Sequence, residues 1–132
     1  MGLLSRIRIC IVDDNRDNAD SLAMVLEAAV FEVHCAYDGP KGLALIRQIK
    51  PHVAILDIGM PGMTGYDVAK AVRSEFGELV GLIAITGWGQ KHDVNAALSA
   101  GFHHHFTKPA DASQVLAKIY ELAKRLDPGK ID

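Results

Sequence analysis

Residues 53–57 read Val-Ala-Ile-Leu-Asp, four apolar residues followed directly by a carboxylate. A strand that is apolar at consecutive positions is buried on both faces, as in a parallel sheet covered by helices on each side. A polar residue directly after such a strand lies at the carboxyl end of the sheet, where open α/β sheets bind their ligands. This stretch therefore predicts both a fold class and the position of a functional site.

The same alternation extends outward in both directions from residues 53–57. Strand-like apolar runs cover residues 7–12, 31–36, 79–85 and 103–107. Helical spacing of apolar residues follows each run, over 17–29, from the break at 38–40 to 49, and over 67–75, 91–100 and 111–126. Five βα units with right-handed connections predict an α/β fold, a doubly wound (βα)5 three-layer sandwich. We expect a single domain over 1–132, with its core at about 7–126 and residues 127–132 as a tail or linker stub.

Composition excludes several classes of protein. The chain has 132 residues, 49% of them hydrophobic, and a net charge of −2, which is typical of one globular domain. No cluster of basic residues predicts a nucleic-acid surface. No apolar run approaches the roughly 20 residues of a membrane helix, and residues 1–8 lack the apolar region of a signal peptide. We expect a cytoplasmic domain without membrane contact, in which Cys10 and Cys35 are buried as small apolar side chains.

Chemically active side chains stand at the ends of four of the five predicted strands. Asp13 and Asp14 follow the first, Asp57 the third, Thr86 the fourth and Lys108 the fifth. Two carboxylates 4 Å apart repel each other by roughly 4 kcal/mol at an effective dielectric constant near 20, so three of them favour a shared divalent cation. Hard oxygen ligands in an open site suit Mg²⁺, and a carboxylate beside Mg²⁺ and a lysine suits in-line phosphoryl transfer.

Four motifs, in order and each at a strand end, carry a resemblance to a known family. They are Ile11–Asn15 (IVDDN), Leu56–Gly65 (LDIGMPGMTG), Ile85–Gly87 (ITG) and Lys108-Pro109. With these motifs the sequence resembles the receiver domains of response regulators in two-component signalling, from residue 7 to residue 126. The resemblance implies a flavodoxin-like fold with the parallel strand order 2-1-3-4-5. Residues 86–90 and 100–105 look most like receivers of hybrid sensor histidine kinases.

The resemblance implies a phosphorylation site and a metal site. Asp57 is similar to the family's phosphoacceptor. Asp14 and Asp57 would ligate Mg²⁺ (or Mn²⁺) directly together with the backbone carbonyl of Gly59, and Asp13 would act through a water molecule. Lys108 would pair with a phosphoryl oxygen.

The resemblance also implies a switch. Thr86 would bond the phosphoryl group, and His105 occupies the position where the family usually carries a tyrosine or phenylalanine switch residue. Pro109 would follow a cis peptide that aims Lys108. The donor would be a phosphohistidine of a histidine kinase or of a phosphotransfer domain, and the surface of the fourth helix, fifth strand and fifth helix would change. Such a domain catalyses only its own phosphorylation and dephosphorylation.

Other readings of the same residues compete with this one. An aspartate-based phosphatase would carry a second acid two residues after the nucleophile, where this chain has Gly59. A flavin-binding module would need a hydroxyl- and glycine-rich phosphate cradle where Asp13 and Asp14 stand. A degenerate, partner-binding receiver would have lost site residues that are all present here.

Residues 103–105 are three histidines, but neighbouring strand residues point to opposite faces, which argues against one metal ion. We also expect Trp88 and Gly59 to border the pocket.

Overall fold

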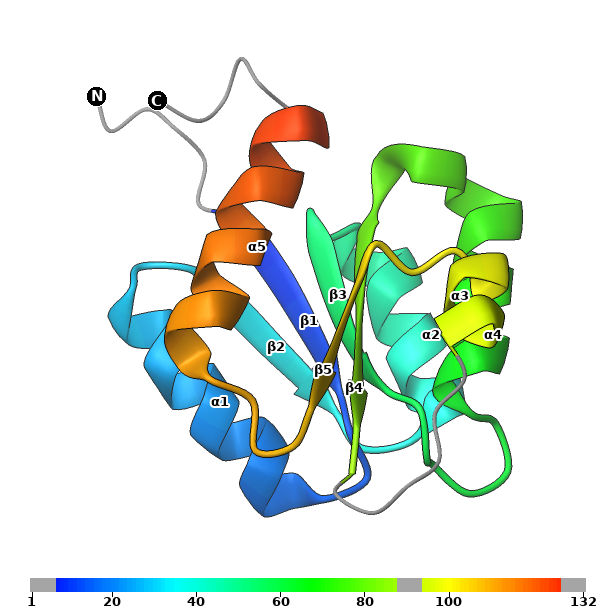
Figure 1. Cartoon of the computed structure of the whole chain (residues 1–132), viewed down its shortest axis with the longest axis horizontal. Coiled ribbons are helices and arrows are strands. Elements are labelled where there is room, and N and C mark those ends of the chain that lie inside the picture. Colours follow the sequence, from blue (N-terminus) through cyan, green and yellow to red (C-terminus); the bar gives the residue numbers. More distant parts are fainter. Residues whose placement is uncertain (1–6, 88–93, 127–132) are drawn as a thin grey trace.

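Strands and helices alternate along the whole of the computed structural model, which describes residues 7–87 and 94–126 (Figure 1). The strands are β1 (Arg8–Val12), β2 (Glu32–Ala36), β3 (Val53–Asp57), β4 (Gly81–Thr86) and β5 (His104–Thr107). The helices are α1 (Arg16–Ala28), α2 (Gly39–Ile49), α3 (Gly65–Phe76), α4 (Val94–Ala100) and α5 (Ala112–Leu126), and a short 3₁₀ helix, η1 (Gly77–Leu79), precedes β4.

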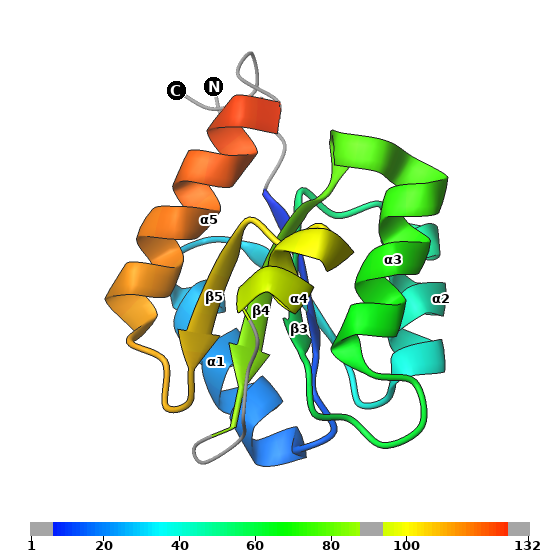
Figure 2. The same ribbon diagram turned by 45° about the vertical axis from the view of Figure 1, so that its right-hand side comes forward.

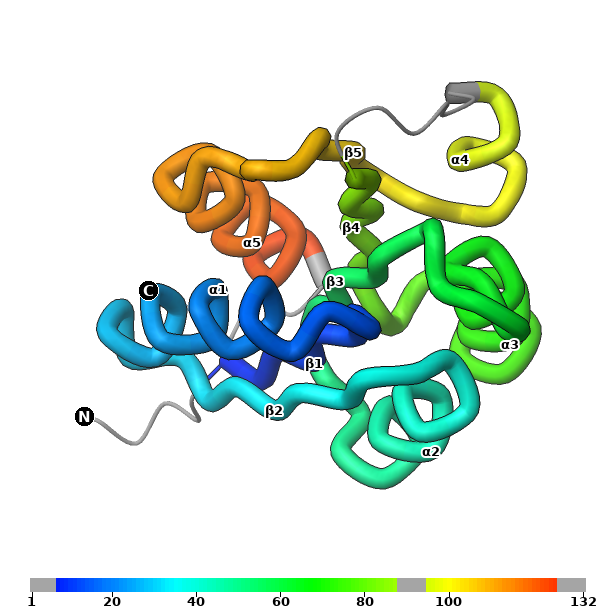
Figure 3. The backbone as a smooth tube through the Cα atoms, turned by 90° about the horizontal axis from the view of Figure 1, so that it is seen from below, coloured from blue at the N-terminus to red at the C-terminus, as the bar shows by residue number. Residues whose placement is uncertain are grey.

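The strands form one parallel sheet in the order β2-β1-β3-β4-β5, which confirms the predicted fold and strand order. Viewed end-on, α1 and α5 lie on one side of the sheet and α2 and α3 on the other (Figure 3). β4 and β5 run side by side in the same direction, so their carboxyl ends meet at one edge (Figure 2). This edge is where the predicted site residues converge.

Two apolar cores, one on each face of the sheet, hold the layers together. Every residue of β3 is buried, because alternate side chains enter opposite cores. Ala54 and Leu56 pack with side chains of α2, α3 and α4, whereas Val53 and Ile55 pack with side chains of α1 and α5. No helix within residues 7–87 and 94–126 is long and apolar enough to cross a membrane.

The two cysteines differ in burial. Cys10 is fully buried, as expected, but Cys35 on the edge strand β2 is only half-buried, with its Sγ 3.8 Å from the Ala19 carbonyl of α1. Burial raises the pKa of both thiols, to about 12 for Cys10 and about 11 for Cys35. Neither thiol is therefore an activated nucleophile.

Two element boundaries differ from the prediction by two residues, for local reasons. The fourth strand begins at Gly81 and not at Leu79, because residues 77–79 form η1 and leave Leu79 74% exposed. α3 begins two residues early, because Thr64 caps it: its hydroxyl accepts from the Asp67 backbone N–H at 3.3 Å, and Asp67 accepts from the Thr64 N–H at 3.0 Å. The predicted helix start at residue 91, Trp88 at the pocket border and the tail at 127–132 lie outside the described residues.

Candidate functional site

Five of the predicted site residues line one cavity at the carboxyl edge of the sheet. Asp57 and Thr86 are the last residues of β3 and β4, Asp13 follows β1 directly, and Lys108 follows β5. A cavity of about 860 Å³ opens here and continues between α1 and the start of α5. Its polar end is lined by Asp13, Asp14, Asp57, Gly59 and Lys108. Parallel strands bring these residues together although nearly a hundred positions separate the first from the last.

Three carboxylates form the centre of this cavity. Asp13, Asp14 and Asp57 each offer an oxygen, and these oxygens lie within 4.8 Å of one another. Asp13 and Asp57 are each only 5% exposed, whereas Asp14 is exposed. Carboxylate oxygens gathered at this spacing are the donor set of a hard divalent cation, so the residues present fit such an ion.

Lys108 pairs with two of the three carboxylates. Its Nζ lies 2.8 Å from Asp13 Oδ2 and 3.5 Å from Asp57 Oδ2. Backbone N–H groups hold the other oxygens: Gly59 donates to Asp57 Oδ1 at 3.2 Å, and Asn15 donates to Asp13 Oδ1 at 2.9 Å. Each of the two carboxylates is therefore fixed by its own loop while one oxygen faces the lysine.

The pKa of Asp57 is raised from 3.8 to about 7. Burial is the largest cause, and the charge of Asp13 adds to it, while Lys108 and the Gly59 N–H act in the opposite direction. The pKa of Lys108 is also raised: burial alone would lower it, but the hydrogen bond and charge of Asp13 and the charge of Asp57 outweigh that effect. The site thus holds more negative charge than one lysine neutralises.

This raised pKa predicts a pH-dependent stability in the absence of divalent cations. Between pH 3.8 and 7 the folded chain binds a proton at Asp57 that the unfolded chain releases, so the free energy of unfolding falls as pH rises through this window. Asp57→Asn removes this decline and is expected to be more stable than the native chain at pH 7.5, by on the order of 2 kcal/mol. Urea denaturation in a chelator at pH 5, 6, 7 and 8 measures it.

The matched control for that measurement is Asp17→Asn, which removes an exposed carboxylate of α1 outside the cavity. Because Asp17→Asn keeps Asp57, its free energy of unfolding is expected to fall with rising pH as that of the native chain does. A difference between Asp57→Asn and the native chain that does not change with pH contradicts the prediction.

The hydroxyl of Thr86 is paired with His105 beside the carboxylates. Thr86 is 1% exposed, and its Oγ1 lies 3.1 Å from His105 Nε2. The backbone N–H of Lys108 donates to the Thr86 carbonyl at 2.7 Å, and the Lys108-Pro109 peptide is cis, as expected. The two predicted switch residues are therefore in direct contact, next to the residue that pairs with Asp57.

The other two histidines of residues 103–105 point elsewhere. His103 lies 3.2 Å from Glu78, and His104 Nε2 lies 3.9 Å from Glu121 of α5. The ring of His105 faces Thr86. The three side chains diverge, as the alternation of a strand requires, and within the described part of the chain the metal-competent cluster is the aspartate group.

Gly65 is a site residue that the sequence analysis did not single out. A Cβ at this position would lie 2.5 Å from the Asp57 carbonyl oxygen and 2.9 Å from Ile58 Cα, so the first turn of α3 packs directly against the backbone that carries the acceptor. Asn15 belongs to a motif quoted above but has no predicted role: its side chain accepts from the Asn18 N–H and caps the start of α1 beside Asp14. Asparagine before a helical repeat is a recognisable N-cap signal, whereas the close approach at Gly65 has no local signal.

Gly65→Ala is expected to lower the free energy of unfolding by about 2 kcal/mol, because the added methyl group overpacks a backbone contact. Urea denaturation measures the loss. Ser74→Ala, an exposed change on the same helix, is the control and should stay within about 0.5 kcal/mol of the native chain. Equal stability of Gly65→Ala and the native chain would show that the backbone yields easily here.

Comparisons with known proteins agree with this geometry. The response regulator receiver domain family matches residues 9–120. The DNA-binding response regulator MtrA of Mycobacterium tuberculosis is 30% identical over 92% of this chain, and a 14.6 kDa protein of Leptolyngbya boryana is 30% identical over 97% of this chain and 98% of its own length. A CheY-like receiver domain from Methanospirillum hungatei superposes with a TM-score of 0.86 at 29% identity, over 94% of this chain and 98% of its own.

The chain spans about half the length of the MtrA proteins and of the RpaA regulator of Synechocystis that it matches. The function of the other half of those proteins belongs to them and is not ascribed to this chain. The family match covers most of the chain, and the fold, the strand order and the acidic cluster agree with it. The chain therefore belongs to the response regulator receiver domain family.

Proposed function

We propose that this chain is a phosphorylation switch that accepts a phosphoryl group on Asp57 from a phosphohistidine of a histidine kinase or a phosphotransfer domain. The observation that carries the proposal is the convergence of three carboxylates within 4.8 Å with Lys108 Nζ 3.5 Å from Asp57 Oδ2. The chain would act in the cytoplasm, where such donors are found, and would catalyse only its own phosphorylation and dephosphorylation.

In the proposed reaction an oxygen of ionised Asp57 attacks phosphorus, the new P–O bond forms, and the P–N bond to the donor histidine breaks. Lys108 neutralises charge on the transferring group, and the Thr86 hydroxyl donates to one of its oxygens. A bound Mg²⁺ (or Mn²⁺) supplies further positive charge at the phosphoryl oxygens. Asp14, Asp57 and the Gly59 carbonyl would hold it directly, and Asp13 through water.

The contact between Thr86 and His105 suggests how the acyl phosphate is sensed. In the unphosphorylated chain the Thr86 hydroxyl pairs with His105 Nε2. A phosphoryl group on Asp57 would draw the hydroxyl toward itself, release the ring and change the surface of α4, β5 and α5. This is a two-state element that one charged group biases.

Thr86→Ala is therefore expected to separate phosphorylation from the surface change. Asp57 should still accept a phosphoryl group, but the change in amide hydrogen exchange that phosphorylation causes in β5 and α5 should be lost. Thr107→Ala, at the exposed end of the same strand as His105, serves as the control and should respond like the native chain. A native-like response of Thr86→Ala contradicts this role.

Two other functions are disfavoured by particular residues. A phosphatase acting on external substrates would need an acid at position 59, and Gly59 has none. A degenerate receiver would lack part of the site, whereas here Lys108 Nζ lies 3.5 Å from Asp57 Oδ2 and the Lys108 N–H donates to the Thr86 carbonyl. Origin in a hybrid kinase, and the absence of a nucleic-acid surface on this domain, remain predictions.

The test is incubation of the chain with acetyl phosphate, with Mg²⁺ or with a chelator, followed by intact-mass measurement. A gain of one phosphoryl mass that requires Mg²⁺ and is lost after alkaline hydroxylamine, which cleaves acyl phosphates, supports the proposal. If the folded chain gains no mass in any condition, it is a partner-binding receiver without the chemistry.

A further inference from the structure

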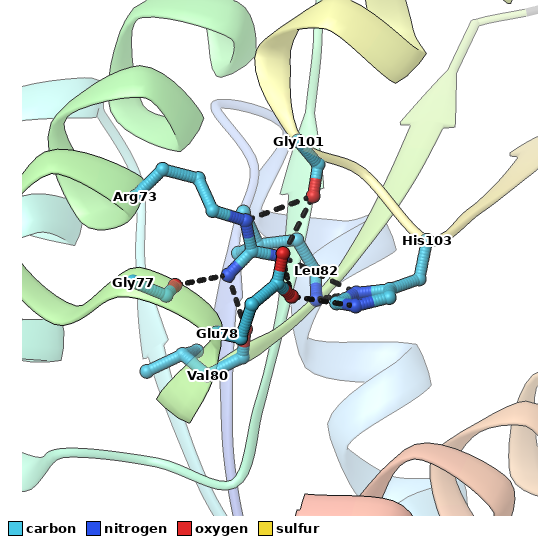
Figure 4. A network of polar contacts seen from close by, with 7 residues as sticks. All are labelled: Arg73, Gly77, Glu78, Val80, Leu82, Gly101 and His103. Atoms are coloured by element: carbon cyan, nitrogen blue, oxygen red, sulfur yellow. Dashed lines mark hydrogen bonds and ion pairs between the residues drawn. The ribbon is translucent and has the colours of Figure 1, made fainter.

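A second polar cluster lies at the opposite end of β4 from the phosphorylation site (Figure 4). It centres on the guanidinium of Arg73 in α3 and includes Glu78 of η1 and His103, which precedes β5. The four residue steps from Leu82 to Thr86 separate the two sites by about 13 Å along β4. The proposed reaction uses none of these side chains, and the family match by itself assigns them no role.

Arg73 binds the backbone at three places. Its Nη1 donates to the carbonyls of Gly77 and Val80, both at 2.7 Å. Its Nε and Nη2 donate to the carbonyl of Gly101, at 3.0 and 2.6 Å. One side chain thus joins the end of α3, the entry into β4 and the residue that ends α4, as the dashed lines in Figure 4 show.

Gly101 is shaped to receive this side chain. It has a φ of +101°, and the N–H groups of Gly101 and Phe102 donate to the carbonyls of Leu98 and Ala97, which is a Schellman motif at the end of α4. A Cβ on Gly101 would lie 2.6 Å from both Cγ and Nε of Arg73. The missing side chain at residue 101 is what lets Arg73 reach the end of the helix.

A second arm joins β4 to the residue before β5. His103 Nδ1 accepts from the Leu82 N–H at 3.1 Å and lies 3.2 Å from Arg73 Nη2, while His103 Nε2 lies 3.2 Å from Glu78. Burial lowers the pKa of His103, and the charges of Arg73 and Arg125 act the same way, so the ring stays neutral and keeps Nδ1 as an acceptor.

The described side chains of α4 bury little apolar surface. Among its side chains that the structure describes, residues 95–100, the buried ones are Ala97 and Ala100, and Leu98 is 62% exposed. α5 in contrast buries Val115, Ile119 and Leu122 completely. A seven-residue helix is not stable alone, and alanine side chains gain little from burial, so contacts at its carboxyl end matter for its position.

We propose that Arg73 is a positioning residue that anchors the carboxyl end of α4, so that the rearrangement started at Thr86 is confined to the part of α4 and β5 nearer the phosphorylation site. The second half of the proposal, the confinement of the rearrangement, rests on the proposed switch function. Its first half, the anchoring of α4, concerns the unphosphorylated chain. The two halves are measured separately.

The experiment compares amide hydrogen exchange in the native chain, Arg73→Met and Arg73→Lys. In Arg73→Met the amides of residues 95–103 are expected to exchange about tenfold faster or more, because a partly buried charged donor to three backbone sites is gone, while β1 and β3 keep their protection. Arg73→Lys keeps the charge but not the planar fork, and should fall between the two. It also provides a folded variant if Arg73→Met does not fold.

The control is Arg47→Met, which removes another arginine that makes two hydrogen bonds. Arg47 of α2 binds Glu75 of α3 twice, at 2.7 Å in each case. It should leave the exchange of residues 95–103 unchanged. Unchanged exchange in Arg73→Met, or a rise that is uniform over the whole chain, overturns the anchoring role.

Phosphorylation by acetyl phosphate and Mg²⁺ tests the second half. Intact mass should show that Arg73→Met accepts the phosphoryl group as the native chain does. In the native chain the resulting change in exchange should stop before Gly101, and in Arg73→Met it should extend through His103. The same extent in both chains overturns the confinement. If even the native chain takes up no phosphoryl group, the proposed function fails, and the exchange of the unphosphorylated chains still decides the anchoring.

Discussion

Asp57→Asn is expected to abolish uptake of a phosphoryl group from acetyl phosphate completely. The amide keeps the shape of the side chain at the end of β3, but it offers no ionised oxygen to attack phosphorus. The neighbouring acids do not replace it. Asp13 is held more tightly than Asp57, with Lys108 Nζ at 2.8 Å against 3.5 Å and a backbone N–H at 2.9 Å against 3.2 Å, and Asp14 lies on the exposed side of the cluster.

Intact-mass measurement after incubation with Mg²⁺ and acetyl phosphate checks this result. Asp17→Asn carries the same chemical change on the surface of α1 and should gain mass like the native chain. The expected higher stability of Asp57→Asn at neutral pH ensures that its loss of phosphorylation is not a loss of fold. A gain of one phosphoryl mass in Asp57→Asn would mean that another side chain accepts the group.

Lys108→Met is expected to slow phosphorylation of Asp57 by about 100-fold or more, the effect of removing one fixed charge or donor from a site where negative charge develops. The unphosphorylated chain would also lose the ammonium that lies between Asp13 and Asp57, at 2.8 and 3.5 Å. Burial and Asp13 already raise the pKa of Asp57, and losing Lys108 removes an opposing influence. Less of the acceptor is then ionised near neutral pH.

The rate of mass gain at saturating Mg²⁺ measures the effect of Lys108→Met. Lys118→Met is the control, because Lys118 is a half-exposed lysine of α5 that contacts Glu121 and not the site. A rate that rises with pH more steeply in Lys108→Met than in the native chain would support the effect on Asp57. A rate within twofold of the native chain at every pH contradicts the role given to Lys108.

Most of the fold is predictable from the sequence because the local pattern of apolar residues corresponds closely to burial in this chain. The run Val53–Leu56 is apolar at every position, and both faces of β3 are covered. The prediction failed at the start of β4, where Leu79 looks like a strand residue but is 74% exposed. Leu79 lies in η1, whose short turn between α3 and β4 is imposed by the positions of those two elements and has no pattern of its own.

The candidate site was predicted from strand ends, and its assembly followed from topology. Once the sheet is parallel, residues that end neighbouring strands must meet, so Asp13, Asp57, Thr86 and Lys108 need no further information to converge. The sequence did not predict which side chains pair with one another within the site. That Lys108 approaches Asp13 more closely than Asp57, and that His105 pairs with Thr86, depends on side-chain packing across four strands.

The sequence by itself determined the five βα units, the edge of the sheet that carries the chemistry and the residue types gathered there. The spacing of apolar residues indicates which positions are buried, and residues that end parallel strands lie at the same edge of the sheet. Only the tertiary structure decided the raised pKa of Asp57, the close approach of Gly65 and the contacts of Arg73. Desolvation, backbone clearance and hydrogen bonds between residues 28 positions apart arise from groups that meet only after folding.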